Sequence, residues 1–460
     1  MFKNEDTIAA IATPVGRGGI GIIRISGSNS LEIARQVFKP KRPTNSFKSH
    51  HLYLGQMYDP FSNDNIDEIL LSFMKAPHSY TREDVVEINS HSGYQILSRI
   101  LRIIIDLGVR LAKPGEFTFR AFLNGRIDLT QAEAVIDLIN SKSEKGLAFL
   151  SKQLQGSFRQ KIDTIRQNAI NILANSEVAI DFPEEADSIS SENLAILIDD
   201  KLIKPLESLI TAHTNRKLWV DGIKTVIVGR VNVGKSSLLN QLLDEQRSIV
   251  TPIPGTTRDV VESAITIGGM PLRLMDTAGL RKAKNEIEKF GVNLTKQKLS
   301  EADFVLLVID QSRPLNQDDF NLIAKVQGKN TLIVINKIDL PSRIGNSIHI
   351  KDFSSLPFAG VSALTGQGLD QLRKAIQNCL LKDDIDDLYS DFAPNLRQSK
   401  AMSDSAQFFR EALHNLKQRL PMEIIAVDLK SGLDALGEIT GETTSEDILN
   451  AIFSQFCLGK

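Results

Sequence analysis

The sequence predicts three structural parts: an N-terminal α+β domain, a helical domain, and a doubly wound α/β domain inserted into the helical one. Residues 1–120 mix short β-like runs with turns. Helical periodicity dominates residues 121–219 and 383–460, whereas residues 220–382 alternate strand-like and helical segments. Such alternation predicts a parallel sheet covered on both faces, and helical segments on both sides of it favour an insertion.

The composition is that of ordinary globular domains. Of the 460 residues, 24% are charged and 42% hydrophobic, and the net charge is −2. No overall positive field attracts nucleic acid, so any RNA contact must be local or supplied by a partner. The two cysteines, Cys379 and Cys457, lack zinc-site spacing and do not imply disulfides, which suits a cytoplasmic protein. No signal sequence is apparent, and no apolar run approaches the ~20 residues of a membrane span.

In the N-terminal part, Gly16-x-Gly18-x-x-Gly21 formally matches a dinucleotide-binding fingerprint. That fingerprint requires a strand before it and a helix after it, whereas a β-like run follows here. We therefore expect a tight glycine turn between two strands.

The helical segments carry two predicted capping boxes and an unusual end. Thr130-x-x-Glu133 and Thr443-x-x-Glu446 each predict a helix start. The tail that follows reads Phe-Cys-Leu-Gly-Lys, from residue 456 to residue 460. It could deliver a thiol, an ammonium and a carboxylate to a site. The alternative is that Cys457 is buried and packs as a small hydrophobic residue.

Residues 229–236 read Gly-Arg-Val-Asn-Val-Gly-Lys-Ser and follow a β-branched run at 225–228. This is the phosphate-binding loop, in which Gly229 and Gly234 let backbone N–H groups turn toward phosphate oxygens. We expect a helix to open at Lys235, which places its N-terminus against the anion. Lys235 should reach the β- and γ-phosphates, and Ser236 should ligate Mg²⁺.

Three further motifs follow in the order that a guanine-nucleotide domain requires. Asp276, in Asp-Thr-Ala-Gly, should hold Mg²⁺ directly or through water, and Gly279 can donate its N–H to the γ-phosphate. In Asn336-Lys337-x-Asp339, the two oxygens of Asp339 match the N1–H and N2–H₂ donors of guanine. Residues 362–364, Ser-Ala-Leu, would offer backbone N–H groups to the guanine oxygen. Together the motifs predict GTP binding.

The hydrolytic group remains open at this point. Residues 251–259 occupy the place of a switch segment, where Thr257 would ligate Mg²⁺ only while the γ-phosphate is present. Leu280 stands where Ras-type enzymes have the water-orienting Gln. Arg281 or Arg258 could act as an arginine finger, or Asn232 could hold a monovalent cation. Glu286 or Glu288 could act through a bridging water. The spacing does not choose among them.

Several stretches together resemble the MnmE (TrmE) family of bacterial tRNA modification GTPases, over nearly the whole chain. They are the Asn232-bearing loop, Gly-Thr-Thr-Arg-Asp at 255–259, Gly-Arg-Gly-Gly at 16–19, Pro-Gly-Glu-Phe at 114–117, Arg-Ala-Phe-Leu-Asn at 120–124, and the terminal Phe-Cys-x-Gly-Lys. The resemblance implies a folate-binding and dimerisation domain at 1–120 and a helical domain made of 121–219 and 383–460. It also implies an inserted Ras-like, doubly wound P-loop GTPase domain at 220–382.

The resemblance also implies site residues. Glu288 corresponds to the family's water-orienting glutamate, Lys235 and Cys457 join it in the catalytic set, and the chemical role of Cys457 stays open. Ser236 and Thr257 would hold Mg²⁺, and Asn232, Thr251, Ile253 and Thr256 would surround K⁺. The folate positions are Arg24, Glu87, Arg126 and Lys460, and some relatives have Lys at the position of Arg126. The expected GTP site comprises Asn232, Val233, Gly234, Lys235, Ser236, Ser237, Thr251, Pro252, Ile253, Pro254, Gly255, Thr256, Thr257, Asp276, Thr277, Ala278, Gly279, Asn336, Lys337, Asp339, Ser362, Ala363 and Leu364.

For function, the resemblance implies a homodimer that works with the flavin- and NADH-using protein MnmG in a heterotetramer. The complex would add aminomethyl or carboxymethylaminomethyl groups to carbon 5 of the wobble uridine of tRNA. A tetrahydrofolate derivative (5-formyl or 5,10-methylene) would donate one carbon. Hydrolysis would be activated by K⁺ when two GTPase domains meet. The alternatives are a ribosome-assembly or signalling GTPase whose flanks are binding modules, or a GTP-gated scaffold. Folate binding would discriminate among them.

Overall fold

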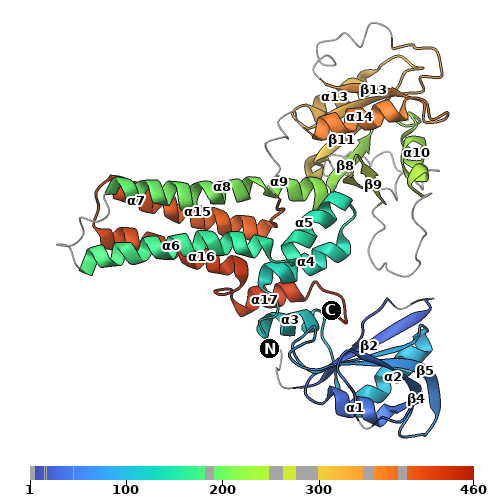
Figure 1. Cartoon of the computed structure of the whole chain (residues 1–460). Helices are drawn as coiled ribbons and strands as arrows, with labels where there is room; N and C mark the ends of the chain where they lie inside the picture. The colour runs from blue at the N-terminus through green and yellow to red at the C-terminus, as the bar shows by residue number, and fades with distance from the viewer. Residues whose placement is uncertain are drawn as a thin grey trace.

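The computed structural model describes residues 6–14, 16, 18–44, 46–181, 191–247, 263–275, 299–344, 356–381 and 391–460. Three parts are evident in Figure 1: a sheet domain at the N-terminus, an elongated helical domain and a second sheet domain. The second sheet domain lies in sequence between two helical segments that pack against each other. The predicted fold class, with an α/β domain inserted into a helical one, is therefore confirmed.

The N-terminal domain is built on a seven-stranded mixed sheet with the order β3-β4-β5-β6-β2-β1-β7. Only the β1–β7 pair is parallel among the strand pairs of this sheet. Helices α1 and α2 bury their apolar positions against the sheet. The elements are β1 (Ile8–Ile11), β2 (Ile20–Ser26), α1 (Ser30–Val37), β3 (Phe38–Pro40), β4 (His51–Tyr58), β5 (Asn65–Met74), β6 (Val85–His91), α2 (Tyr94–Asp106) and β7 (Arg110–Leu111).

The helical domain is assembled from both halves of the chain. Helices α6, α7, α8, α15 and α16 share one apolar core and lie side by side as a long bundle (Figure 1). Its elements are α3 (Glu116–Leu123), α4 (Leu129–Asn140), α5 (Glu144–Leu154), α6 (Ser157–Asp181), α7 (Ser191–Ile198), η2 (Asp199–Ile203), α8 (Lys204–Thr211), α9 (His213–Arg216), η3 (Lys217–Asp221), α15 (Leu396–Lys417), α16 (Met422–Thr440) and α17 (Glu446–Phe453). None of the described helices is long and apolar enough to cross a membrane.

The inserted domain has a six-stranded sheet with the order β13-β12-β11-β8-β10-β9, in which only β9 runs antiparallel to its neighbour. Helices α10 and α14 cover one face and α13 covers the other, so two cores flank the sheet. The elements are β8 (Ile223–Val228), α10 (Lys235–Arg247), β9 (Ser263–Ile267), β10 (Met270–Leu274), β11 (Phe304–Asp310), α13 (Gln317–Val326), β12 (Thr331–Asn336), β13 (Phe358–Val361) and α14 (Leu369–Leu380).

Both predicted capping boxes are wrong in detail. Helix α4 is capped by Asp128, whose carboxylate accepts hydrogen bonds from the backbone N–H groups of Thr130 and Gln131 at 2.7 and 3.0 Å. A charged carboxylate is the stronger acceptor, and the Thr130 hydroxyl donates to it as well, at 2.6 Å. In the last helix Ser445 is the N-cap, because the Thr443 hydroxyl donates to the carbonyl of Asp434 at 3.0 Å instead.

The rejection of the dinucleotide fingerprint is confirmed. Strand β2 begins at Ile20, directly before Gly21, and pairs antiparallel with β1. The third glycine therefore lies inside a strand, and no helix opens after it.

Candidate functional site

The phosphate-binding loop lies between the buried strand β8 and helix α10, which opens at Lys235 as predicted. Its two glycines are sterically required. Gly234 has φ +97°, and an added Cβ would lie 2.2 Å from Asn336 Nδ2; at Gly229 a Cβ would lie 2.4 Å from the carbonyl of Val308. Helix N-termini attract anions, so the sequence places a phosphate-sized cradle at the carboxyl edge of the sheet.

Lys235 reaches across this loop. Its ammonium donates to the carbonyls of Gly229 and Arg230 at 2.7 and 2.6 Å. Burial lowers the pKa of Lys235, because the charged form loses solvation. No carboxylate of the described residues pairs with this lysine, and an anion placed in the cradle would supply a counter-charge.

Asn336 joins the phosphate loop to the segment that follows β13. Its side-chain amide donates to the carbonyl of Val233 at 2.7 Å and accepts from the backbone N–H of Ala363 at 2.9 Å. Asn336 is only 1% exposed and Ser362 is fully buried. The structure thus brings three separate motifs together, and Asn336 holds two of them in place by hydrogen bonds.

Lys337 also joins the phosphate loop to a neighbouring strand. Its partner on that strand is Asp310, which the sequence analysis did not identify. Its ammonium donates to the carbonyl of Asn232 at 3.1 Å and to Asp310 Oδ2 at 2.6 Å. Burial raises the pKa of Asp310, but the hydrogen bonds from Lys337 and Ser312 outweigh burial and hold that pKa below its usual range. Asp310 pairs in register with Asn336 at the ends of two parallel strands, a position from which it could have been found.

The remaining described members of the predicted nucleotide site lie at the surface of this edge. Ser236, Ser237, Asp339 and Leu364 are exposed. The other predicted members lie outside the described residues: Thr251, Pro252, Ile253, Pro254, Gly255, Thr256, Thr257, Asp276, Thr277, Ala278, Gly279 and Glu288. The described residues of the predicted site therefore include the phosphate loop and the two motifs expected to contact guanine. They do not include the two switch segments.

A second constellation forms in the N-terminal domain, where the C-terminal tail docks. The backbone N–H of Phe117 donates to the carbonyl of Lys460 at 3.2 Å, and Arg24 Nη1 donates to the carbonyl of Gly459 at 3.2 Å. Gly459 has φ +88°, and an added Cβ would lie 2.5 Å from the carbonyl of Ile11. The tail is thus held by backbone contacts that a side chain at residue 459 would block.

All four residues predicted for folate binding lie around this tail. Arg24 and Glu87 are opposite each other on β2 and β6 and form an ion pair at 2.8 Å. Burial and the neighbouring Arg24 lower the pKa of Lys460, while the nearby Cys457 and Glu87 act in the opposite direction. Arg126 reaches the same place through the ring of Tyr80, with its guanidinium 4.7 Å from the ring centroid.

Tyr80 is the residue of this constellation that the sequence did not indicate. The Arg24 guanidinium lies 5.5 Å from the same ring, and the Tyr80 hydroxyl is 3.0 Å from Thr118 Oγ1. Arginine over an aromatic face is a favourable cation–π contact. No motif surrounds Tyr80, so only the folded chain shows its position.

Cys457 is exposed. The interpretation of it as a buried packing residue is therefore wrong. Its backbone carbonyl accepts from the N–H groups of Gly115 and Lys460, each at 3.4 Å. The thiol is accessible at the edge of the docked tail.

Comparisons with known proteins agree with this geometry. A family profile described as "MnmE helical domain" matches residues 129–457, and one described as "GTP-binding protein TrmE N-terminus" matches residues 7–126. The tRNA modification GTPase MnmE of Geotalea uraniireducens is 44% identical over 461 residues, covering 99% of both chains. The proteins of the same name from Natranaerobius thermophilus and Clostridioides difficile are 43% and 44% identical, each over 99% of this chain and 100% and 99% of their own.

Proposed function

Because the chain belongs to the MnmE family of tRNA modification GTPases, we propose that it is the GTP-hydrolysing half of an enzyme that modifies wobble uridines. It is a P-loop GTPase. Together with MnmG it adds aminomethyl or carboxymethylaminomethyl groups to carbon 5 of uridine in tRNA. The chain acts as a homodimer within a cytoplasmic heterotetramer.

The observation that carries this proposal is the docked tail. The phosphate loop and the Asn336-Lys337 network would serve any GTPase of this fold. A tail that sets Cys457 and Lys460 beside Arg24 and Glu87 is not required for GTP hydrolysis. It supports a second chemical site in the same chain, as a modifying enzyme needs.

The residues of the tail site fit a tetrahydrofolate derivative. The Glu87 carboxylate can accept hydrogen bonds from a pterin ring, and Arg24, Arg126 and Lys460 suit an anionic tail. Tyr80 offers a flat face already bordered by two guanidinium groups. A bound 5-formyl- or 5,10-methylene-tetrahydrofolate would supply the one-carbon unit, and the chain's own groups would bind and orient it.

In the nucleotide site we assign roles by the family correspondence. Ser236 and Thr257 hold Mg²⁺, while Asn232, Thr251, Ile253 and Thr256 hold K⁺. Glu288 orients the attacking water, and Asp339 reads guanine. Of these residues, Asn232 has φ +65°, and its carbonyl accepts a hydrogen bond from Lys337.

We expect hydrolysis to be about tenfold faster in KCl than in NaCl at equal ionic strength. Equal rates would contradict the role of K⁺ and leave the other assignments standing.

The second candidate, a ribosome-assembly or signalling GTPase, is favoured only by the generality of the nucleotide site. Folate binding separates the two. Isothermal titration of the full chain with 5-formyl-tetrahydrofolate should give saturable binding that Arg24→Ala weakens about tenfold or more. Arg99→Ala, which removes an exposed guanidinium of the same domain that pairs with Asp59 and Asp64, is the control. Absence of binding to the wild type would favour the second candidate.

A further inference from the structure

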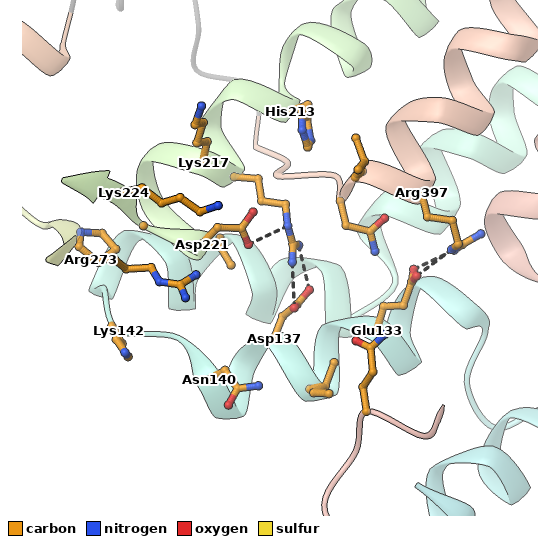
Figure 2. A pocket seen from close by; sticks show the side chains of 18 of the residues that line it. Glu133, Asp137, Asn140, Lys142, His213, Lys217, Asp221, Lys224, Arg273 and Arg397 are labelled. Atoms are coloured by element: carbon orange, nitrogen blue, oxygen red, sulfur yellow. Dashed lines mark hydrogen bonds and ion pairs between the residues drawn. The ribbon is translucent and has the colours of Figure 1, made fainter. Parts of the chain in front are cut away.

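An open cleft lies where the helical domain meets the inserted domain. Its volume is about 920 Å³, and its walls come from α4 and the α4–α5 connection, the α9–η3 segment, strands β8 and β10, the start of α15 and the end of α17. Figure 2 shows Lys217, Lys224 and Arg273 at one end, and Lys142 below them on the α4–α5 connection. None of the described residues assigned to the nucleotide site or to the tail site lines this cleft.

The cleft carries an excess of positive charge. Among the described residues, six lysines and arginines line it, against four aspartates and glutamates. The acids are already engaged: Arg216 pairs with both Asp137 and Asp221, at 2.8 and 3.0 Å. Figure 2 shows another pair at the far end, between Arg397 and Glu133 at 2.7 Å.

Two lysines of the cleft, Lys142 and Lys224, are available to bind an external anion. Asp303 is paired with Lys217 at 2.7 Å, and its other oxygen accepts the backbone N–H of Lys224 at 3.1 Å. Within the described ranges, Lys142 and Lys224 have no ion pair, and both are exposed. Both lysines therefore line the cleft without an ion pair to any carboxylate in the described part of the chain.

The wall chemistry favours a phosphate backbone over a small organic ligand. Sites for small molecules are lined mainly by apolar and aromatic side chains. Here ten of the twenty lining residues are charged, and Asn140, Asn395 and Gln455 add amide groups. Long, exposed cations that neutralise successive phosphates are the usual means of holding nucleic acid without reading its sequence.

We propose that this cleft binds phosphates of the tRNA backbone. The inference rests on the proposed function, in which tRNA is the substrate. Because the chain has a net charge of −2, it needs such a local positive site for contact with RNA. The cleft holds the RNA at the connection through which the inserted domain joins the helical domain.

That connection contains the single tryptophan of the chain, which gives a native reporter. Trp219 is 5% exposed and packs in the core of the inserted domain. The Ser143 hydroxyl donates to its carbonyl, and the Lys145 ammonium lies 4.2 Å from its ring centroid. Its neighbour in sequence, Val220, lines the cleft, so we expect the fluorescence of Trp219 to respond when an anion binds there.

The test is a charge reversal on both walls of the cleft. Fluorescently labelled tRNA is titrated with the full chain at several salt concentrations, using the wild type and the Lys142→Glu/Lys224→Glu double variant. The variant should bind about tenfold or more weakly, and its salt dependence should fall by about two in log–log slope. GTP hydrolysis should be unchanged, because neither lysine belongs to the nucleotide site.

A matched control makes the same change of net charge elsewhere. Lys161 on α6 and Lys325 on α13 are exposed and do not line the cleft. Lys161→Glu/Lys325→Glu should keep affinity within about twofold. Equal losses in both double variants, unchanged binding in the cleft variant, or no wild-type binding at low salt would each overturn the proposal.

Two further arms identify the source of the phosphate and the level of any failure. Orthophosphate and GMP are titrated while the fluorescence of Trp219 is followed. The proposal would be overturned if the cleft variant lost a saturable response to these anions but bound tRNA as tightly as the wild type. The cleft would then be a site for free anions. Nucleoside analysis of tRNA from cells lacking the gene tests the proposed function separately. Loss of the carbon-5 modifications there, with normal tRNA binding by the cleft variant, would leave the function standing and reject only the cleft.

Discussion

The nucleotide site and the tail site are assembled in opposite ways. In the inserted domain, short contiguous motifs stand at the ends of neighbouring parallel strands, and Asn336 and Lys337 link them across the loop. In the N-terminal domain, Arg24 and the carbonyl of Gly459 meet although 435 positions separate them in sequence. The first site needs only its own domain. The second needs both ends of the chain, because the last residues must return to the first sheet.

This difference predicts that each site can be broken without the other. A change in the phosphate loop should remove GTP binding and spare the tail site. A change in the tail should do the reverse. Variants at the two sites are therefore each other's controls.

The largest effect is expected for Gly234→Ala. The residue has φ +97°, and its added Cβ would lie 2.2 Å from Asn336 Nδ2. Strained backbone alone costs about 1–3 kcal/mol, and the overlap adds to it. Affinity for a fluorescent GTP analogue should fall at least about hundredfold, with folate binding retained. Gly19→Ala, which has no atom within 4 Å of the added Cβ, should change neither; near-normal GTP affinity for Gly234→Ala would refute the loop geometry.

Glu288→Ala should come next. If this residue orients the attacking water, the hydrolysis rate falls about hundredfold while GTP affinity stays within about twofold. Single-turnover hydrolysis and equilibrium binding of the same samples measure both quantities. Glu286→Ala is the matched control, since spacing alone does not choose between the two acids; loss of hydrolysis in that variant would transfer the role to it.

Gly459→Ala should weaken binding of 5-formyl-tetrahydrofolate about tenfold, because the new methyl group would meet the Ile11 carbonyl and displace the tail. GTP hydrolysis should be unaffected. Leu458→Ala alters the neighbouring side chain, which is 55% exposed, and should leave folate binding intact. Equal folate affinity in wild type and Gly459→Ala would show that tail docking is dispensable for the ligand.

The smallest effect is expected for Asp310→Asn, which removes the buried partner of Lys337. We expect a loss of about 1–2 kcal/mol in the free energy of unfolding of the inserted domain at neutral pH. Since the pKa of Asp310 is lowered from 3.8 in the folded chain, its stabilisation is present above that pH. It is lost as the pH falls through the lowered value. The difference in unfolding free energy between wild type and variant, measured in urea, should therefore shrink as the pH falls below 3.8. A difference that does not shrink there would exclude the ion pair as its cause.

The two sites also differ in how many of their residues could be predicted from the sequence. The phosphate loop, Asn336 and Lys337 could be predicted from the sequence, because each motif is contiguous and follows a strand-like run. Asp310 was missed, although its place at the end of β11, in register with Asn336, follows from the same rule. Tyr80 could not be found from pattern alone, because its neighbours Arg24 and Arg126 reach it only through tertiary packing.

The first residues of helix α4 show that prediction from a local sequence pattern is also limited. Thr130 matched a capping pattern, yet the Asp128 carboxylate accepts the N-terminal N–H groups of α4. Two acceptors competed within three residues, and the charged one prevailed. The resemblance of the chain to a family supplied the folate positions, whereas their convergence on the tail became visible only in the folded chain.

We propose that the chain joins a GTPase site to a second site for tRNA modification, built by its C-terminal tail. Nucleoside mass spectrometry of tRNA from cells lacking the gene tests it most directly, with complementation by wild type, Gly459→Ala, Lys460→Ala or Cys457→Ser. We predict loss of the carbon-5 wobble-uridine modifications, restored by the wild type and not by the tail variants. An unchanged nucleoside profile in the deletion strain, or full restoration by every tail variant, would contradict the account.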